Sequence, residues 1–184
     1  ILTRYYPPEG QKALTGIIAQ LVGFDLESGA IAESTHPFTS GMGAGDTRFT
    51  TRYYPNELNV SVFGTLHEAG HGLYDQGLLV EHHGTPMGES VSLGIHESQA
   101  RMWENLVGRS RAFWQYALPI ARGVFPDKLA GVSLDDFVWA VNGVEPSFIR
   151  VEADEATYNM HIMLRFELEQ KIIAGDLDVS DIPS

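Results

Sequence analysis

The sequence predicts a mainly α-helical fold with a short β-strand or small sheet beside its central helix. Apolar residues recur at helical spacing over several long stretches, whereas residues 47–54 are rich in β-branched and aromatic side chains. An apolar content of 43% and a charged content of 20% are typical of a globular protein. A chain of 184 residues can bury a sizeable core, so we expect residues 1–184 to form a single domain.

The first third of the chain predicts one helix, one loop and one strand. Residues 11–22 show the periodicity of an amphipathic helix, which Gly23 ends. Residues 25–45 are rich in Gly, Ser and Thr, and we expect a loop that contains His36. In the strand that follows, alternation places Arg48 and Phe49 on opposite faces.

The remainder is predicted to be helical. A central helix is expected over residues 57–76, a second over residues 90–107 and a last one over residues 154–174. A further helix follows Ser110, and Pro119 is expected to kink or end it. Before one more apolar run, Ser133 and Asp136 have the spacing of a capping box.

Charge and composition exclude several classes of function. A net charge of −12 argues against nucleic acid and anionic membrane surfaces as partners. No stretch approaches the ~18 apolar residues of a membrane span. The chain contains no cysteine, so a metal site would have to use His, Asp and Glu. We take the cytoplasm as the default location.

The central helix carries the pattern His67-Glu68-Ala69-Gly70-His71. Residues four apart on an α-helix differ by about 40° in direction and about 6 Å in height, so the two imidazoles share a face. They can bind one metal ion, and Glu68 beside them can take a proton from a water on that ion. The alternative is a buried helix with two core histidines.

Two histidines leave such a site incomplete, because a catalytic zinc usually has three protein ligands. His82 and His83 follow the motif in a Gly- and Pro-containing loop and are candidates, as are Glu89 and His96. Glu97 is another candidate, although Arg101, four residues later, could simply neutralise its carboxylate in an ion pair.

Five short motifs span residues 36–154. They are His36-Pro37-Phe38, Asp46-Thr47-Arg48-Phe49-Thr50, His67-Glu68-Ala69-Gly70-His71, His96-Glu97-Ser98-Gln99 and Ile149-Arg150-Val151-Glu152-Ala153-Asp154. Together and in this order, they make the chain resemble the thermostable (Taq-type) metallocarboxypeptidases.

The resemblance implies a helical zincin-like fold in which His67, His71 and Glu97 bind a divalent metal, zinc or cobalt, and Glu68 is the general base. It also implies a homodimer that removes C-terminal residues from peptides. Recognition of a free C-terminal carboxylate suits a guanidinium, so Arg48 and Arg150 are candidate substrate-binding residues. His36 is a third candidate for substrate contact.

The resemblance covers only the central segment of the longer family chains, so we expect residues 1–184 to be a partial catalytic domain. Two alternatives remain open. The chain could be a catalytically incomplete metal-binding fragment with a structural or dimerisation role, or it could be a zinc endopeptidase. Thermolysin-like endopeptidases resemble the first motif, but they place Asp where this chain has Arg101.

Overall fold

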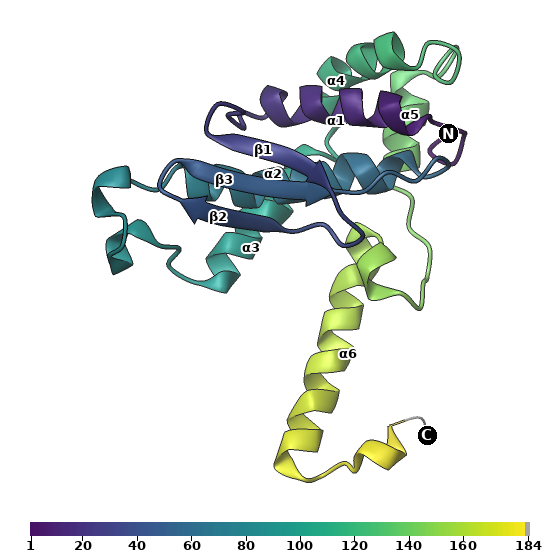
Figure 1. Ribbon diagram of the computed structural model, residues 1–184. Coiled ribbons are helices and arrows are strands. Elements are labelled where there is room, and N and C mark those ends of the chain that lie inside the picture. Colours follow the sequence, from purple (N-terminus) through teal and green to yellow (C-terminus); the bar gives the residue numbers. More distant parts are fainter. Residues whose placement is uncertain (183–184) are drawn as a thin grey trace. The chain divides into compact units, whose positions relative to one another are not determined.

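The computed structural model describes residues 1–182, and the chain folds into two compact units. The first unit comprises residues 1–141, and the second begins at Asn142. Helices dominate both, as the sequence predicts (Figure 1). None of the helices in the described part of the chain is long and apolar enough to span a membrane.

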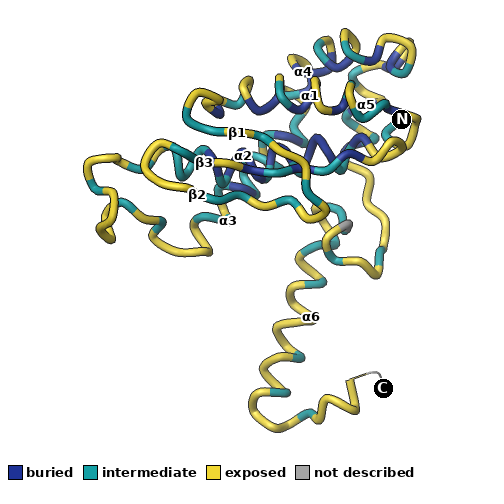
Figure 2. The backbone as a smooth tube through the Cα atoms, viewed as in Figure 1, coloured by how far each residue is buried: buried dark blue, intermediate teal, exposed yellow. Residues whose placement is uncertain are grey.

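Four helices build the main core of the first unit. They are α1 (Pro8–Leu21), α2 (Leu58–Gln76), α4 (Arg111–Val124) and α5 (Leu134–Val141). Figure 2 shows their dark, buried inner positions. Large apolar side chains from separate helices meet there, among them Leu14, Leu66, Trp114 and Phe137. The burial of their apolar surface is the main force that fixes α2 in place.

A small sheet lies against α2. Among the described residues it has three strands, β1 (Gly29–Glu33), β2 (Thr39–Gly43) and β3 (Asp46–Thr51), in the order β1-β3-β2. β1 pairs parallel to β3, and β2 pairs antiparallel to it. Alternation is as predicted: Phe49 is buried against Phe24 and Ala69, while Arg48 is exposed. The sheet therefore uses β3 to pack on the helix that carries the histidines.

The prediction of a loop over residues 25–45 is wrong, because this segment supplies β1 and β2. Neither strand contains a buried residue, so neither shows the alternation of buried and exposed side chains that marks a strand. They form because β3 offers a hydrogen-bonding edge on each side. Of the two outcomes predicted for Pro119, a kink or a helix end, the helix end is wrong, since α4 continues to Val124. Pro119 is exposed, so water can solvate the carbonyl that the proline leaves without a donor.

The helix predicted over residues 90–107 begins at α3 (Leu93–Arg101) and continues as a π-helical segment, Met102–Val107. Ser92 caps α3 by accepting a hydrogen bond from the Ile95 amide. The wider π turn changes the direction in which later side chains point, and such turns often occur at functional sites. Between α2 and α3 lie two short 3₁₀ helices, Val80–His82 and Pro86–Gly88.

Glycine lets α2 and α3 approach closely. A Cβ atom on Gly70 would lie only 2.7 Å from the Cα of Ala100, so a larger residue does not fit. Gly70 precedes His71 on α2, and Ala100 lies three residues after Glu97 on α3. The contact therefore brings the two motifs together.

The second unit contains one long helix, α6 (Glu155–Ala174). Asp154 caps its start by accepting hydrogen bonds from the amides of Ala156 and Thr157, and Gly175 ends it with a φ of 78°. A 3₁₀ turn, Arg150–Glu152, precedes α6, and a second one, Val179–Asp181, follows it. The capping box at Ser133 is confirmed in the first unit, because Ser133 and Asp136 exchange backbone-to-side-chain hydrogen bonds.

Candidate metal centre

Three side chains that could hold a metal ion converge from two helices. His67 and His71 lie one turn apart on α2, and Glu97 comes from α3. Glu97 Oε2 is 3.6 Å from His67 Nε2 and 3.2 Å from His71 Nε2. Within residues 1–182 this is the group whose ligand atoms lie within 4.8 Å of one another, and His82 and His83 do not belong to it.

The outer nitrogen of His67 has a carboxylate partner. His67 Nδ1 lies 2.9 Å from Glu104 Oε2, in the π-helical segment. Burial opposes the charge on Glu104, but the hydrogen bond and charge of His67, helped by Arg101 and Arg109, outweigh it and hold the pKa of that carboxyl below its usual value. Glu104 therefore remains an anion that accepts from Nδ1, and Nε2 is left to face Glu97.

His71 has a different partner on its outer side. Its Nδ1 lies 2.5 Å from His96 Nδ1, and His96 Nε2 lies 2.9 Å from Asp75 Oδ1. Both histidines of the motif thus use Nδ1 for contacts with the protein and direct Nε2 to the same point. Two imidazole nitrogens and one carboxylate oxygen are a donor set that suits a divalent ion such as zinc. The residues present therefore fit a metal.

Glu97 keeps its charge at this point. Burial raises the pKa of its carboxyl, but the hydrogen bond from His71 and the charges of His67, His71 and Arg101 together bring it below the usual value. The ion pair expected from the sequence is present, since Arg101 Nε lies 3.3 Å from Glu97 Oε1. The other oxygen, Oε2, faces the histidines, so the ion pair and the cluster exist together.

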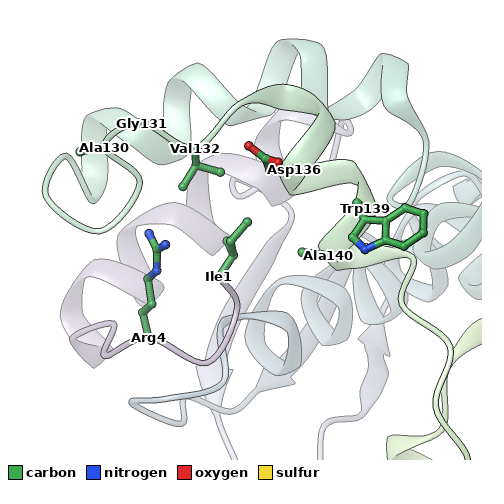
Figure 3. Close-up of a pocket in the computed structure, with 8 residues that line it drawn as sticks. All are labelled: Ile1, Arg4, Ala130, Gly131, Val132, Asp136, Trp139 and Ala140. Atoms are coloured by element: carbon green, nitrogen blue, oxygen red, sulfur yellow. The ribbon is translucent and has the colours of Figure 1, made fainter.

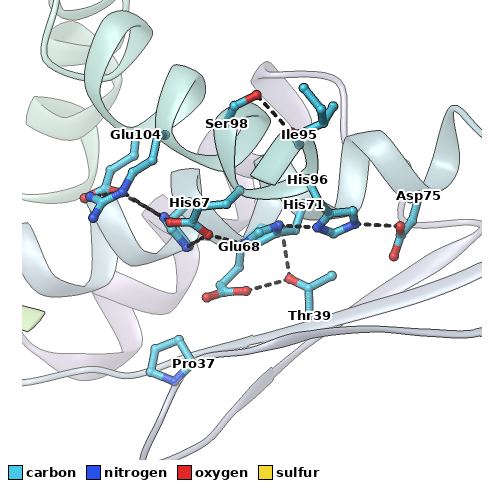
Figure 4. Close-up of polar contacts among 12 residues, drawn as sticks. Pro37, Thr39, His67, Glu68, His71, Asp75, Ile95, His96, Ser98 and Glu104 are labelled. Carbon is cyan, nitrogen blue, oxygen red and sulfur yellow. Dashed lines mark hydrogen bonds and ion pairs between the residues drawn. The ribbon is translucent and has the colours of Figure 1, made fainter. Parts of the chain in front are cut away.

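Glu68 lies between the two histidines in sequence and is 6% exposed. Thr39 on β2 donates a hydrogen bond of 2.6 Å to its Oε2 (Figure 4). The carboxylate is thus held on the sheet side of α2. Sequence reasoning did not identify Thr39, because a threonine in a Gly- and Ser-rich stretch gives no signal of its own.

Arg48 and His36 are expected substrate contacts that the structure places at the surface. Arg48 makes two parallel hydrogen bonds to Asp46, of 2.8 and 2.7 Å, and its side chain is 57% exposed. The guanidinium that would bind a substrate carboxylate is therefore paired with Asp46. His36 is exposed, and its Nδ1 lies 2.8 Å from the Pro37 carbonyl oxygen.

Arg150 lies in the second unit. It hydrogen-bonds to the Tyr158 hydroxyl, and its guanidinium lies 5.3 Å from the centre of that ring. Its role in substrate binding stays a prediction.

Glu104 and Asp75 are two further residues at the centre that sequence reasoning missed. Asp75 lies four residues after His71, so helical spacing could have drawn attention to it. Nothing comparable points to Glu104, because its position depends on the π turn.

A pocket elsewhere in the first unit carries no comparable chemistry (Figure 3). Its charged lining residues already have partners: Arg4 donates to the Lys128 carbonyl, and Asp136 accepts from Ser133. Trp139, also on its rim, is 83% exposed.

Comparison with known proteins identifies relatives over the whole chain. The sequence model of the carboxypeptidase Taq (M32) metallopeptidases matches residues 1–184. Thermostable carboxypeptidase 1 of Thermus thermophilus is 55% identical over 183 residues, which are 100% of this chain and 36% of the relative. Carboxypeptidase 1 of Bacillus subtilis is 42% identical over the same shares of the two chains.

Solved structures agree with the sequence relatives. The crystal structure of the M32 carboxypeptidase from Deinococcus radiodurans R1 matches with a TM-score of 0.96 and 46% identity, over 98% of this chain and 36% of that one. The carboxypeptidase of Pyrococcus furiosus matches with a TM-score of 0.94 and 38% identity, over 99% and 37%. The chain thus spans about a third of the length of these relatives. It belongs to the carboxypeptidase Taq (M32) family of metallopeptidases.

Proposed function

We propose that residues 1–184 are a partial catalytic domain of a metal-dependent carboxypeptidase, which removes C-terminal residues from peptides. The observation that carries the proposal is the convergence of His67, His71 and Glu97, with Glu68 beside them, in a chain of a metallopeptidase family. The curated relatives that support it are named carboxypeptidases.

Each side chain has a separate task in this proposal. His67, His71 and Glu97 bind the ion, with zinc as the preferred metal and cobalt as the alternative. A divalent ion held there would supply Lewis-acid chemistry, which polarises a carbonyl and lowers the pKa of a bound water. Glu68 takes the proton of the attacking water and delivers it to the leaving amine. Thr39 orients Glu68 through the hydrogen bond to Oε2.

Recognition of the substrate terminus is assigned to Arg48, Arg150 and His36. A guanidinium can hold a carboxylate by two parallel hydrogen bonds, and Arg48 already holds Asp46 in this way. Binding of substrate by Arg48 therefore requires that the substrate carboxylate replace Asp46. Arg150 donates instead to the Tyr158 hydroxyl, so a substrate carboxylate that binds Arg150 would approach beside this ring.

The proposal also includes a cytoplasmic homodimer that acts on peptides and not on nucleic acid. Val91 and Leu106, exposed by 75% and 70%, supply apolar surface that association would cover. A metal-binding fragment with a structural role is the second candidate. It is favoured by one observation, namely that the three candidate ligands converge within residues 1–182, which is enough to hold an ion without hydrolysis. The endopeptidase alternative has no comparable support.

One experiment separates these functions. The zinc-loaded chain is incubated with a peptide that has a free C-terminus and with the same peptide amidated, and products are followed by mass spectrometry. Stepwise loss of C-terminal residues from the free peptide alone is expected. Internal cuts in both peptides would indicate an endopeptidase. Zinc binding without cleavage of either peptide would favour the structural fragment.

A further inference from the structure

We propose that Asp75 and His96 act together as positioning residues for His71, and hold its imidazole in the tautomer that leaves Nε2 available to the metal ion. The inference rests on the proposed function, because it takes His71 as a metal ligand. It assigns a role to the first residue of His96-Glu97-Ser98-Gln99, whose second residue is the expected ligand.

The three side chains form a continuous line of contacts (Figure 4). His71 Nδ1 lies 2.5 Å from His96 Nδ1, and His96 Nε2 lies 2.9 Å from Asp75 Oδ1. The ring planes of the two histidines differ by 20°, and the ring centres are 4.6 Å apart. Because the nitrogens are much closer than the centres, the rings meet edge to edge and nearly in one plane. The in-plane approach is that of an N–H···N hydrogen bond, at a distance shorter than the ordinary range of about 2.7–3.2 Å.

Counting protons gives the direction of each bond. A carboxylate can only accept, so His96 Nε2 carries the proton in the contact with Asp75. A neutral imidazole has one N–H, and His96 Nδ1 is therefore an acceptor. The proton between the two rings then belongs to His71 Nδ1. When His71 is neutral, as a metal ligand must be, its lone pair is then at Nε2, the atom that lies 3.2 Å from Glu97 Oε2.

The fold makes this arrangement rigid. His71 and Asp75 lie on successive turns of α2, and His96 of α3 inserts its ring between them. The side chains of His96 and Asp75 are only 17% and 20% exposed. The Tyr74 ring packs 5.0 Å from the His96 ring. His96 thus does for His71 through a second imidazole what Glu104 does for His67 directly.

The test is the zinc affinity of the 184-residue chain, measured by competition with a chromophoric chelator and without peptide. His96→Phe keeps a ring of similar size but removes the acceptor. Loss of such an outer partner weakens metal binding by ~10- to 100-fold, and we expect a loss in this range. Asp75→Ala frees His96 to take the other tautomer and should weaken binding in the same direction.

Two further variants separate positioning from general damage. His96→Asn offers an amide oxygen as acceptor for His71 Nδ1 and should restore binding close to the wild-type value. His82→Phe makes the same change as His96→Phe outside the cluster and should leave zinc binding unchanged. Nitrogen-15 NMR of the histidine rings provides a second readout. The His71 proton is expected on Nδ1 in the wild-type chain and in a mixture of tautomers in His96→Phe.

Wild-type zinc affinity and an unchanged His71 tautomer in both His96→Phe and Asp75→Ala would overturn the inference while leaving the proposed function intact. A wild-type chain that binds no zinc would overturn both. Weakened binding in His96→Phe without rescue by His96→Asn would show that the ring only fills space, and this too would contradict a positioning role.

Discussion

The two long helices, α2 and α6, differ sharply in how many of their residues are buried. They have 19 and 20 residues, and both are bordered by family motifs or contain one. Ten residues of α2 are buried, whereas none of the described residues of α6 is. The apolar residues Met160, Leu164 and Phe166 on α6 are each more than half exposed.

Capping residues and helix propensity are therefore enough to form a helix, but a metal site also needs tertiary packing that fixes the helix in place. α6 has a good N-cap in Asp154 and a glycine stop in Gly175. α2 lacks a side-chain cap, and its position is fixed by packing against α1, the sheet and α3. A metal site needs ligands held within fractions of an ångström, and packed helices provide that rigidity.

The largest expected effect is on the rate of peptide hydrolysis, which should depend on a carboxylate of α2 and not on one of α6. Glu68→Gln keeps the shape of the α2 side chain but removes the base, so peptide hydrolysis should fall by ~10²–10⁴ while zinc content is unchanged. Glu167→Gln makes the same change on an exposed position of α6 and should leave the rate unaltered. Near-normal turnover in Glu68→Gln would show that another group activates the water.

The next effect concerns stability. Leu66 on α2 is fully buried, and Leu66→Ala should lower the free energy of unfolding by about 2–5 kcal/mol because it leaves a cavity. Leu164 on α6 is 58% exposed, and Leu164→Ala should change the free energy of unfolding by less than about 0.5 kcal/mol. Urea denaturation of the two variants tests the comparison. Equal losses would mean that α6 is packed as firmly as α2.

A smaller effect is expected from two glycines within α2. The Cβ of Gly70→Ala would meet the backbone of α3 at 2.7 Å, so the helices must separate, at a cost of about 1–3 kcal/mol and with weaker zinc binding. The Cβ of Gly64→Ala has an ordinary contact at 3.6 Å, and this variant should be slightly more stable than the wild type. Equal zinc affinity in both variants would show that the close approach is not needed for the site.

The smallest effect is a pH dependence in the metal-free chain. Burial lowers the pKa of the His67 imidazole, but the hydrogen bond and charge of Glu104, with the charges of Glu97 and Glu68, raise it overall above 6.5. The pKa of Glu104 is below 4.5. The raised pKa of His67 stabilises the fold below pH 6.5, and this contribution is lost as the pH rises through the folded-state pKa.

The lowered pKa of Glu104 has the opposite dependence. It stabilises the fold above pH 4.5, and its contribution is lost as the pH falls through the folded-state pKa. The pair therefore contributes most between pH 4.5 and 6.5. Urea denaturation at about pH 5.5 and about pH 8.5 should show a larger difference in the wild type than in Glu104→Gln. The same difference in both would contradict the ion pair.

The elements that the sequence predicts well are those with a strong period or a cap. The helix of His67 and His71 begins one residue from its predicted start, and α6 is bounded by Asp154 and Gly175 as its sequence indicates. The strands β1 and β2 were missed because their pairing comes from β3 and not from their own composition.

The same distinction holds at the candidate metal centre. Three spaced residues, His67, His71 and Glu97, could be found from motifs, and the fold brings them together. Glu104 and Thr39 could not be found, because a π turn and an edge strand place them and neither has a sequence signal. Tertiary packing selects such partners from residues that look ordinary along the chain.

The central claim is that His67, His71 and Glu97 hold one metal ion, and the most direct test is metal content after dialysis. Elemental analysis of the wild-type chain should give one zinc per chain. Glu97→Ala should lose most of it, and His71→Ala should lose all of it, because each removes a ligand. His82→Ala should keep the full content. Loss of zinc in His82→Ala with retention in Glu97→Ala would contradict the account.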